Sequence, residues 1–210
     1  MMADTKAAQR AADQALLDAV RGFARTHPAK DIDRFLPALC AEPDSWQMVE
    51  PSDLPASKTL AAAGSRTDPA THAIWSAFAD AQACSRWEQS YTKADGLVGD
   101  DMLNGYGFIE IIGKRGPFLS TQVRSGIGVW GPNITYPRHR HQAEEIYVGI
   151  AGAADFTLGV GGHTETRRAA AGDAVYVAPQ QPHGFVTTDE LFVVFYIWQA
   201  GDMREVSKFG

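Results

Sequence analysis

The stretch YPRHRHQAEEIYVGIAG, residues 136–152, places two of the chain's six histidines, two adjacent glutamates and two tyrosines in and before an apolar run. His139 and His141 are two residues apart, and side chains two apart on a β-strand point to the same face. Glu145 and Tyr147 share a face for the same reason. A turn between the two pairs would bring two imidazoles, a carboxylate and a phenol towards one point.

A third imidazole comes from the later stretch GDAVYVAPQQPHGF, residues 172–185, in which a turn, a short strand and a proline-containing turn lead to a histidine. Three imidazoles and one carboxylate suit a divalent transition metal such as Zn, Fe, Mn, Co or Ni. Mg and Ca prefer oxygen ligands throughout, so the pattern argues against them. We therefore predict a metal site made of His139, His141, Glu145 and His183.

The second half of the chain consists of short β-branched and aromatic runs separated by glycine and proline, which is typical of an antiparallel sandwich or small barrel. Gly161 and Gly162 stand between two such runs and predict a hairpin turn. The runs that we expect to form strands are residues 106–112, 120–131, 145–152, 154–160, 163–169, 174–179, 183–188 and 191–199.

The first half of the chain has helical periodicity instead. Apolar residues between Ala12 and Ala24 recur on one helical face. Pro28 then ends this helix, because proline disfavours helix in the residue before it. We expect two further helices within residues 31–41 and 71–91, and between them, at residues 42–70, a loop with at most one helical turn.

The change of pattern near residue 100 divides the chain into two parts. The prediction is a helical N-terminal cap over residues 1–103 and a β-barrel over residues 104–210. We expect the helices to cover one face of the barrel or to supply a dimer contact, so that the two parts form one compact unit. The predicted fold class is mainly β with an N-terminal α-helical region.

Composition and charge narrow the classes of function. The chain has 210 residues, 45% of them apolar, and a formal net charge of −6. It has no block of lysine and arginine, which argues against a nucleic-acid or anionic-membrane surface. Cys40 and Cys84 lie in segments of helical pattern without a CxxC spacing, so we expect free thiols. The N-terminal segment is polar and no apolar run reaches the ~18 residues of a membrane span, so we expect a cytoplasmic protein.

The residues of the stretches 136–152 and 172–185 resemble the two motifs of the cupin superfamily. The resemblance implies a small β-barrel, a double-stranded β-helix or jelly roll, with the metal in its mouth. Two positions depart from the pattern: Thr187 stands where cupins usually have Asn, and the glycine before the first histidine is displaced to Gly131. The first motif, HxHxxxExxxxxxG, appears as His139, His141, Glu145 and Gly152, and the second as Gly172, Asp173, Pro179, Pro182 and His183.

Two tyrosines near this metal site point to a reaction. Tyr147 lies on the ligand face, and Tyr136 lies just before the first motif strand. A phenol with a pKa near 10 is a weak base at neutral pH, but a nearby divalent cation favours the phenolate. A phenolate of either residue would be a competent base for a weakly acidic C–H bond.

With the tyrosines included, the pattern is similar to a narrower group, the cupin dimethylsulfoniopropionate (DMSP) lyases. The motif HxHxxxExY, a preceding Tyr-Pro and an aromatic residue at Trp198 carry this resemblance. It implies β-elimination of DMSP to dimethyl sulfide and acrylate, with Tyr136 or Tyr147 as the base. It also implies substrate contacts from Trp198, Tyr136 and His139, and it leaves open whether His139 binds the metal. The sulfonium group suits aromatic faces, for which Trp198, Tyr196, Phe185 and Trp130 are candidates.

Cupins perform many reactions, so other functions stay open. The alternatives are another metal-dependent cupin enzyme on a small carboxylate, such as an Fe(II) dioxygenase or an isomerase, and a non-catalytic cupin that binds a ligand. In every case we expect a small-molecule partner, and a homodimer is possible. Outside the site, we expect Glu144 and His163 to face solvent, and His27 and His72 to be structural or exposed.

Overall fold

Two β-sheets face each other in the computed structural model, which describes residues 2–63, 68–159, 161–205 and 207–209. Neighbouring strands are antiparallel, except for the parallel pair β3 and β4. The large sheet has the order β1 (Ser45–Trp46), β4 (Phe118–Leu119), β3 (Tyr106–Gly113), β5 (Val123–Trp130), β12 (Phe192–Gln199), β7 (Glu144–Ala151), β10 (Ala174–Val177), and β2 (Trp87–Glu88) also pairs with β3. The small sheet has the order β13 (Lys208–Phe209), β6 (Thr135–Arg140), β11 (His183–Thr187), β8 (Ala153–Leu158), β9 (Glu165–Ala170).

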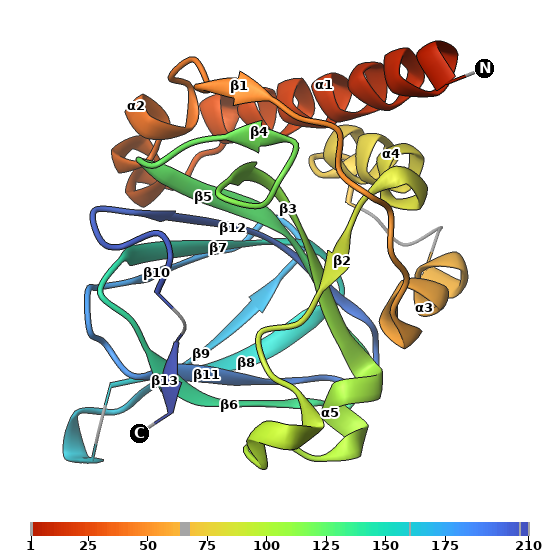
Figure 1. Ribbon diagram of the computed structural model, residues 1–210. Coiled ribbons are helices and arrows are strands. Elements are labelled where there is room, and N and C mark those ends of the chain that lie inside the picture. The colour runs from red at the N-terminus through yellow and green to blue at the C-terminus, as the bar shows by residue number, and fades with distance from the viewer. Residues whose placement is uncertain (1, 64–67, 160, 206, 210) are drawn as a thin grey trace.

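Helices from the first half of the chain cover the outer face of the large sheet. Figure 1 shows α1 and α4 lying over that sheet, on the side away from the small sheet. The prediction of a mainly β fold with an N-terminal helical region is therefore confirmed, while the boundary at residues 103 and 104 stays a prediction. The helices are α1 (Met2–Thr26), α2 (Leu36–Leu39), α3 (Pro55–Ala63), α4 (His72–Ala81) and α5 (Asp100–Gly105), with short 3-10 turns η1 (Lys30–Arg34), η2 (Gln82–Cys84), η3 (Lys93–Asp95) and η4 (Gly161–His163). None of the helices in the described part of the chain is both long and apolar enough to cross a membrane.

The large sheet is buried on both faces, and this explains its apolar runs. Along β12, Phe195 and Ile197 pack towards the helices, whereas Tyr196 and Trp198 belong to the cluster between the sheets. The strand β7 alternates in the same way. Strands covered on both sides lose the alternation of polar and apolar residues. One face of these strands therefore packs in a core under the helices, and the other face lines the interior between the sheets.

The expected strands all form, with ends shifted by up to three residues. The strand expected at residues 154–160 reaches residue 160, which lies outside the described residues. β8 and β9 form the predicted hairpin, and its loop carries the 3-10 turn η4 rather than a two-residue turn. Gly152 of the first motif has φ of +68°, and a side chain there would meet the backbone oxygen of Leu191. This position requires glycine because both the conformation and the space exclude other residues.

Two expectations for the first half are wrong. The helix expected at residues 71–91 ends with α4 and η2, and Trp87 lies in strand β2 instead. Trp87 packs against Phe78, so its helical spacing reflects a shared core and not a continuous helix. The expected loop at residues 42–70 contains the helix α3, which begins at Pro55, and proline is well suited to the first helical turn. Residues 64–67 of that loop lie outside the described residues.

Glu144 does not face solvent as expected. Its residue is 8% exposed, because the outer face of β7 lies under the N-terminal segments. Its carboxylate accepts hydrogen bonds from Arg34 of η1, from Tyr176 of β10 and from Gln199 of β12, at 2.8 to 2.9 Å. The hydrogen bond from Arg34 therefore connects η1 of the N-terminal region to β7, the strand that also carries Glu145. His163 and His72 are exposed, as expected.

We predict that Glu144→Ala lowers the free energy of unfolding by about 1–3 kcal/mol, because three donors lose their acceptor. Denaturant unfolding followed by circular dichroism measures the change. The matched control is Glu165→Ala, which removes an exposed glutamate from β9 and should change stability by less than about 0.5 kcal/mol. Equal stability of the two variants would contradict a connecting role for Glu144.

Candidate metal centre

Four predicted ligands come from facing sheets and meet between them. His139 on β6 pairs with His183 on β11, and their ring centroids are 4.2 Å apart. His141 follows the end of β6, while Glu145 extends from β7 of the large sheet. The ligand atoms of the three histidines all lie within 4.8 Å of one another, and all four residues are buried. Residues 139–145 and the distant His183 thus supply one cluster.

Backbone contacts fix which nitrogen each histidine presents to the cluster. The Nδ1 atom of each of the three rings lies 2.8 or 2.9 Å from a carbonyl oxygen two residues away. A carbonyl oxygen only accepts hydrogen bonds, so Nδ1 carries the proton and Nε2 keeps its lone pair. Histidines that bind metals commonly have this second contact, which fixes tautomer and ring orientation.

The carboxylate of Glu145 meets these lone pairs directly. Its Oε2 atom lies 2.9 Å from Nε2 of His141 and 3.3 Å from Nε2 of His183. Nε2 of His183 has no hydrogen-bond partner among the described residues. Imidazole nitrogens and a carboxylate that converge in a buried place suit a shared cation. The donor set therefore fits a divalent metal with nitrogen and oxygen ligands.

Burial keeps His139 in the form that a ligand needs. Burial, together with the nearby His183, lowers the pKa of His139 to about 3. The ring is therefore neutral at pH 7, and neutral imidazole is the form that binds metals. Its ring also contacts Tyr136, with centroids 4.6 Å apart. The arrangement allows His139 to bind metal, substrate or both.

The two predicted tyrosines come from different strands beside the cluster. Tyr147 is two residues beyond Glu145 on β7, and its hydroxyl faces that carboxylate. Tyr136 of β6 packs against His139. Burial, the largest cause, raises the pKa of each phenol well above the usual 10, with nearby carboxylate and phenol groups adding to the rise. Without a cation, neither phenol would ionise near neutral pH.

Trp198 lies between a histidine of the cluster and an arginine. Its ring stacks on His141, with centroids 3.9 Å apart and planes inclined by 27°. The guanidinium of Arg124 lies over the ring, with its carbon 5.1 Å from the centroid. Arg124 comes from β5 and His141 precedes β7, and β12 runs between those two strands. The two groups therefore cover Trp198 from opposite sides, which leaves the edge of the indole as its open part.

A cavity with a volume of about 190 Å³ opens beside the cluster on the inner face of the large sheet. Glu145, Tyr136, Tyr147 and Trp198 line it, together with Trp130 and Tyr196. Phe185 does not line it: the ring packs among Phe156, Phe192 and other residues of the barrel core. The site thus has a small chamber, lined by aromatic and charged side chains, next to the converging ligand atoms.

Two charged residues of this cavity that pair with each other were not predicted from the sequence. Arg124 of β5 and Glu110 of β3 both line it, and they form an ion pair of 2.8 Å with side chains 11% and 2% exposed. The sequence does carry a signal for this pair, because each of the two apolar strands contains a single charged residue. Met203, Arg204, Glu205 and Ser207 near the C-terminus also line the cavity, although they belong to no motif.

The two departures from the cupin motifs lie away from the cluster and contact each other. The hydroxyl of Thr187 donates a 2.7 Å hydrogen bond to the carbonyl oxygen of Gly131. The same hydroxyl accepts one from the backbone N–H of Ile134. These residues join the start of β6 to the end of β11, so the departures concern strand connection and not the ligands.

Comparison with known proteins agrees with the motifs. A family model described as dimethylsulfoniopropionate lyase matches residues 27–194. The dimethylsulfoniopropionate lyase DddQ of Ruegeria pomeroyi is 32% identical over 171 residues, which cover 80% of this chain and 82% of that protein. A putative dimethylsulfoniopropionate lyase, DddL of Cereibacter sphaeroides, is 37% identical over 68 residues, covering 32% of this chain and 28% of that protein.

Solved structures agree over almost the whole chain. The crystal structure of DMSP lyase DddQ from Ruegeria pomeroyi superposes with a TM-score of 0.80 at 30% identity, covering 94% of this chain and 95% of that one. A structure from work on the DMSP lyases RdDddP and RnDddQII gives a TM-score of 0.83 at 25% identity, covering 96% and 99%. The cupin-type barrel with helices before it is therefore confirmed. This chain belongs to the dimethylsulfoniopropionate lyase family.

Proposed function

We propose that this protein cleaves DMSP into dimethyl sulfide and acrylate by β-elimination. The observation that carries the proposal is the pair of buried tyrosines beside a cluster of three histidine lone pairs and one carboxylate. This arrangement occurs in a chain that belongs to the DMSP lyase family. A phenol can remove a proton from carbon, whereas histidines that hold a metal through Nε2 and donate Nδ1–H to a carbonyl have no nitrogen left to act as a base.

His139, His141, Glu145 and His183 would hold the metal, which we propose to be Zn, Fe, Mn, Co or Ni. When bound, it would supply positive charge that stabilises the substrate carboxylate as negative charge develops and that favours ionised phenols nearby. The backbone contacts at Nδ1 support this assignment, because they hold the three rings ready without further rearrangement.

Tyr147 is the residue that we propose as the base. Its hydroxyl lies next to the carboxylate of Glu145, a proposed ligand on the same strand, whereas the ring of Tyr136 packs against His139. In the reaction the phenolate oxygen takes the α-proton, the electron pair of that C–H bond forms the C=C bond, and the C–S bond breaks. Sulfur keeps the electron pair of the broken bond and leaves as neutral dimethyl sulfide. The proton on Tyr147 then returns to solvent.

Tyr136, His139 and Trp198 would position the substrate. Tyr136 and Trp130 line the cavity with ring centroids 5.2 Å apart, and aromatic faces attract a sulfonium cation. Trp198 differs from them, because His141 and Arg124 already cover its two faces. We therefore propose that Trp198 contributes its edge to the substrate chamber, while the sulfonium lies nearer Tyr136.

The test is headspace detection of dimethyl sulfide from purified protein and DMSP. We expect release of dimethyl sulfide in a metal-loaded sample, loss of release with a chelator, and recovery when a single divalent metal is returned. Release should be equal with and without O₂, because elimination consumes no oxidant. No dimethyl sulfide from protein with a full complement of metal would sink the proposal, and dependence on O₂ would favour an oxygenase.

A cytoplasmic location also belongs to this proposal. It is supported by Cys40 and Cys84, which are both free thiols, as expected for a reducing compartment. The homodimer stays a prediction.

A further inference from the structure

The inner face of the large sheet carries a second polar cluster, on the side of Trp198 away from His141. Arg124 of β5 is the cross-strand partner of Trp198 on β12, and Tyr196 lies two residues before Trp198 on the same face. All three line the cavity. Tyr196 pairs with Gly126, where a Cβ atom would lie 2.7 Å from the tyrosine hydroxyl, so the glycine provides the space for that hydroxyl.

Two buried donors of this cluster have no partner. The indole Nε1 of Trp198 and the hydroxyl of Tyr196 have no hydrogen bond to any described residue, although each residue is only 7% exposed. An unsatisfied buried polar group costs about 1–3 kcal/mol, so such groups usually mark the place of a ligand or an ordered water. The indole N–H can only donate, so its partner must be an acceptor.

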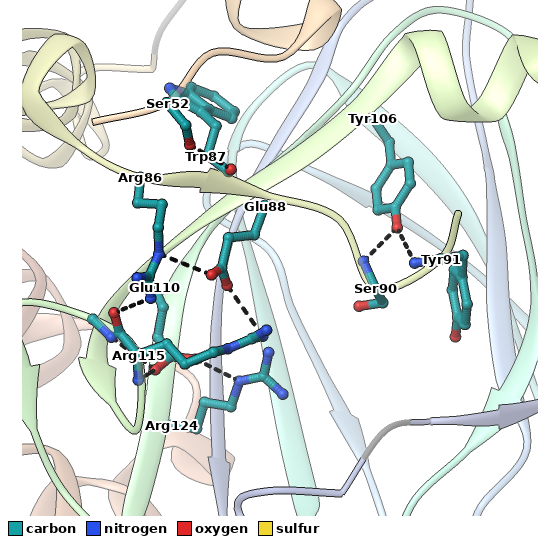
Figure 2. A network of polar contacts seen from close by, with 11 residues as sticks. Ser52, Arg86, Trp87, Glu88, Ser90, Tyr91, Tyr106, Glu110, Arg115 and Arg124 are labelled. Atoms are coloured by element: carbon teal, nitrogen blue, oxygen red, sulfur yellow. Dashed lines mark hydrogen bonds and ion pairs between the residues drawn. The ribbon is translucent and has the colours of Figure 1, made fainter. Parts of the chain in front are cut away.

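Arg124 adds positive charge at the same place. Its Nε donates to Oε2 of Glu110, and the backbone N–H groups of Arg115 and Gly116 donate to Oε1 of that carboxylate. Figure 2 shows the terminal nitrogens of Arg124 on the side of its guanidinium away from Glu110. Glu110 therefore fixes the side chain through one nitrogen and leaves the paired N–H donors available. A guanidinium held in this way suits a planar carboxylate.

We propose that Arg124, Tyr196 and Trp198 form a binding site for a small carboxylate, separate from the histidine cluster. The ligand must be an acceptor with negative charge and must be small enough for a cavity of about 190 Å³. A monocarboxylate with the chemistry of acrylate meets these requirements. The site would hold the anionic product after it leaves the histidine cluster, near Lys114, which also lines the cavity. The link to a product rests on the proposed function, whereas carboxylate binding does not.

The experiment is calorimetric titration of the full chain with acrylate, both metal-loaded and after treatment with a chelator. We expect chelated protein to bind acrylate but not the uncharged analogue acrylamide. Arg124→Gln should weaken acrylate binding roughly 10-fold or more, since a hydrogen bond to a charged group contributes that much. Tyr196→Phe should weaken it by about 2–10-fold, as expected for a single hydroxyl. The matched control is Arg204→Gln, which removes the same charge from an exposed residue of the same cavity and should change affinity by less than about twofold.

Two outcomes would overturn the site: no acrylate binding by chelated wild-type protein, or equal weakening by Arg124→Gln and Arg204→Gln. Arg124→Gln removes the cation that pairs with the buried Glu110. Each variant is therefore first checked for folding by thermal unfolding. If that variant does not fold, the double variant Glu110→Gln/Arg124→Gln and the variant Tyr196→Phe decide instead. The chelated titration does not depend on release of dimethyl sulfide, so failure of this site and failure of the lyase proposal give different results.

Discussion

Tyr147→Phe is expected to lower kcat for dimethyl sulfide release by about 10²–10⁴-fold while the protein keeps its metal. The substitution removes only the hydroxyl that faces Glu145 and leaves the buried ring in place. Because burial holds the pKa of this phenol high, it depends on the nearby cation to ionise, and phenylalanine has no group to replace it. Steady-state headspace assays measure kcat, and elemental analysis of the same sample measures metal content.

Two further tyrosine variants make this test specific. Tyr136→Phe should also retain the metal and lose much of its turnover, because Tyr136 contacts His139 in the same cavity. Tyr176→Phe is the control, because Tyr176 bonds Glu144 on the outer face of the large sheet and should leave turnover unchanged. Near-full activity of both Tyr147→Phe and Tyr136→Phe would remove the tyrosine-base mechanism.

His183→Ala and Glu145→Ala are expected to lower the metal affinity by at least ~100-fold, and turnover with it. Loss of an outer contact to a metal ligand already costs roughly 10–100-fold in affinity, and these residues supply ligand atoms themselves. Both side chains are buried on paired strands, His183 on β11 and Glu145 on β7, so neighbouring residues cannot move into their place without breaking strand pairs. Metal stoichiometry after dialysis, followed by competition with a chelator, measures the effect.

The matched controls use the same residue types outside the cluster. His163→Ala removes an exposed histidine of η4, and Glu144→Ala removes the carboxylate next to Glu145 that faces the helices. Both should retain the metal, with Glu144→Ala measured below its unfolding midpoint. A wild-type metal content in His183→Ala or Glu145→Ala would refute the proposed ligand set.

Sequence spacing was enough to predict the faces of individual strands. The two-residue separations in the first motif place Glu145 and Tyr147 on the inner face of β7, and the structure has them there. The strands and the first helix could be predicted because hydrophobic period is a local property. The prediction of one helix over residues 71–91 was wrong for the same reason. Trp75, Phe78 and Trp87 fit one period, yet Trp87 reaches the same core from a strand.

What covers a face could not be predicted from local pattern. Glu144 lies on the face opposite Glu145, as the spacing required, but the N-terminal helices cover that face and bury the carboxylate. Arg124 and Glu110 likewise read as isolated charges in the sequence, and only pairing of β3 with β5 brings them together. Long-range pairing decides burial, and burial decides which charges need partners.

The sequence by itself determined the mainly β fold, the four candidate ligands and the two tyrosines, because their spacing follows from strand geometry and from two compact motifs. Only the tertiary structure decided how they are held. The contacts of Trp198 with His141 and Arg124, and the ion pair of Arg124 and Glu110, join residues from different segments of the chain. Such contacts depend on which strands become neighbours, and that is settled by packing of the whole chain rather than by any single stretch of it.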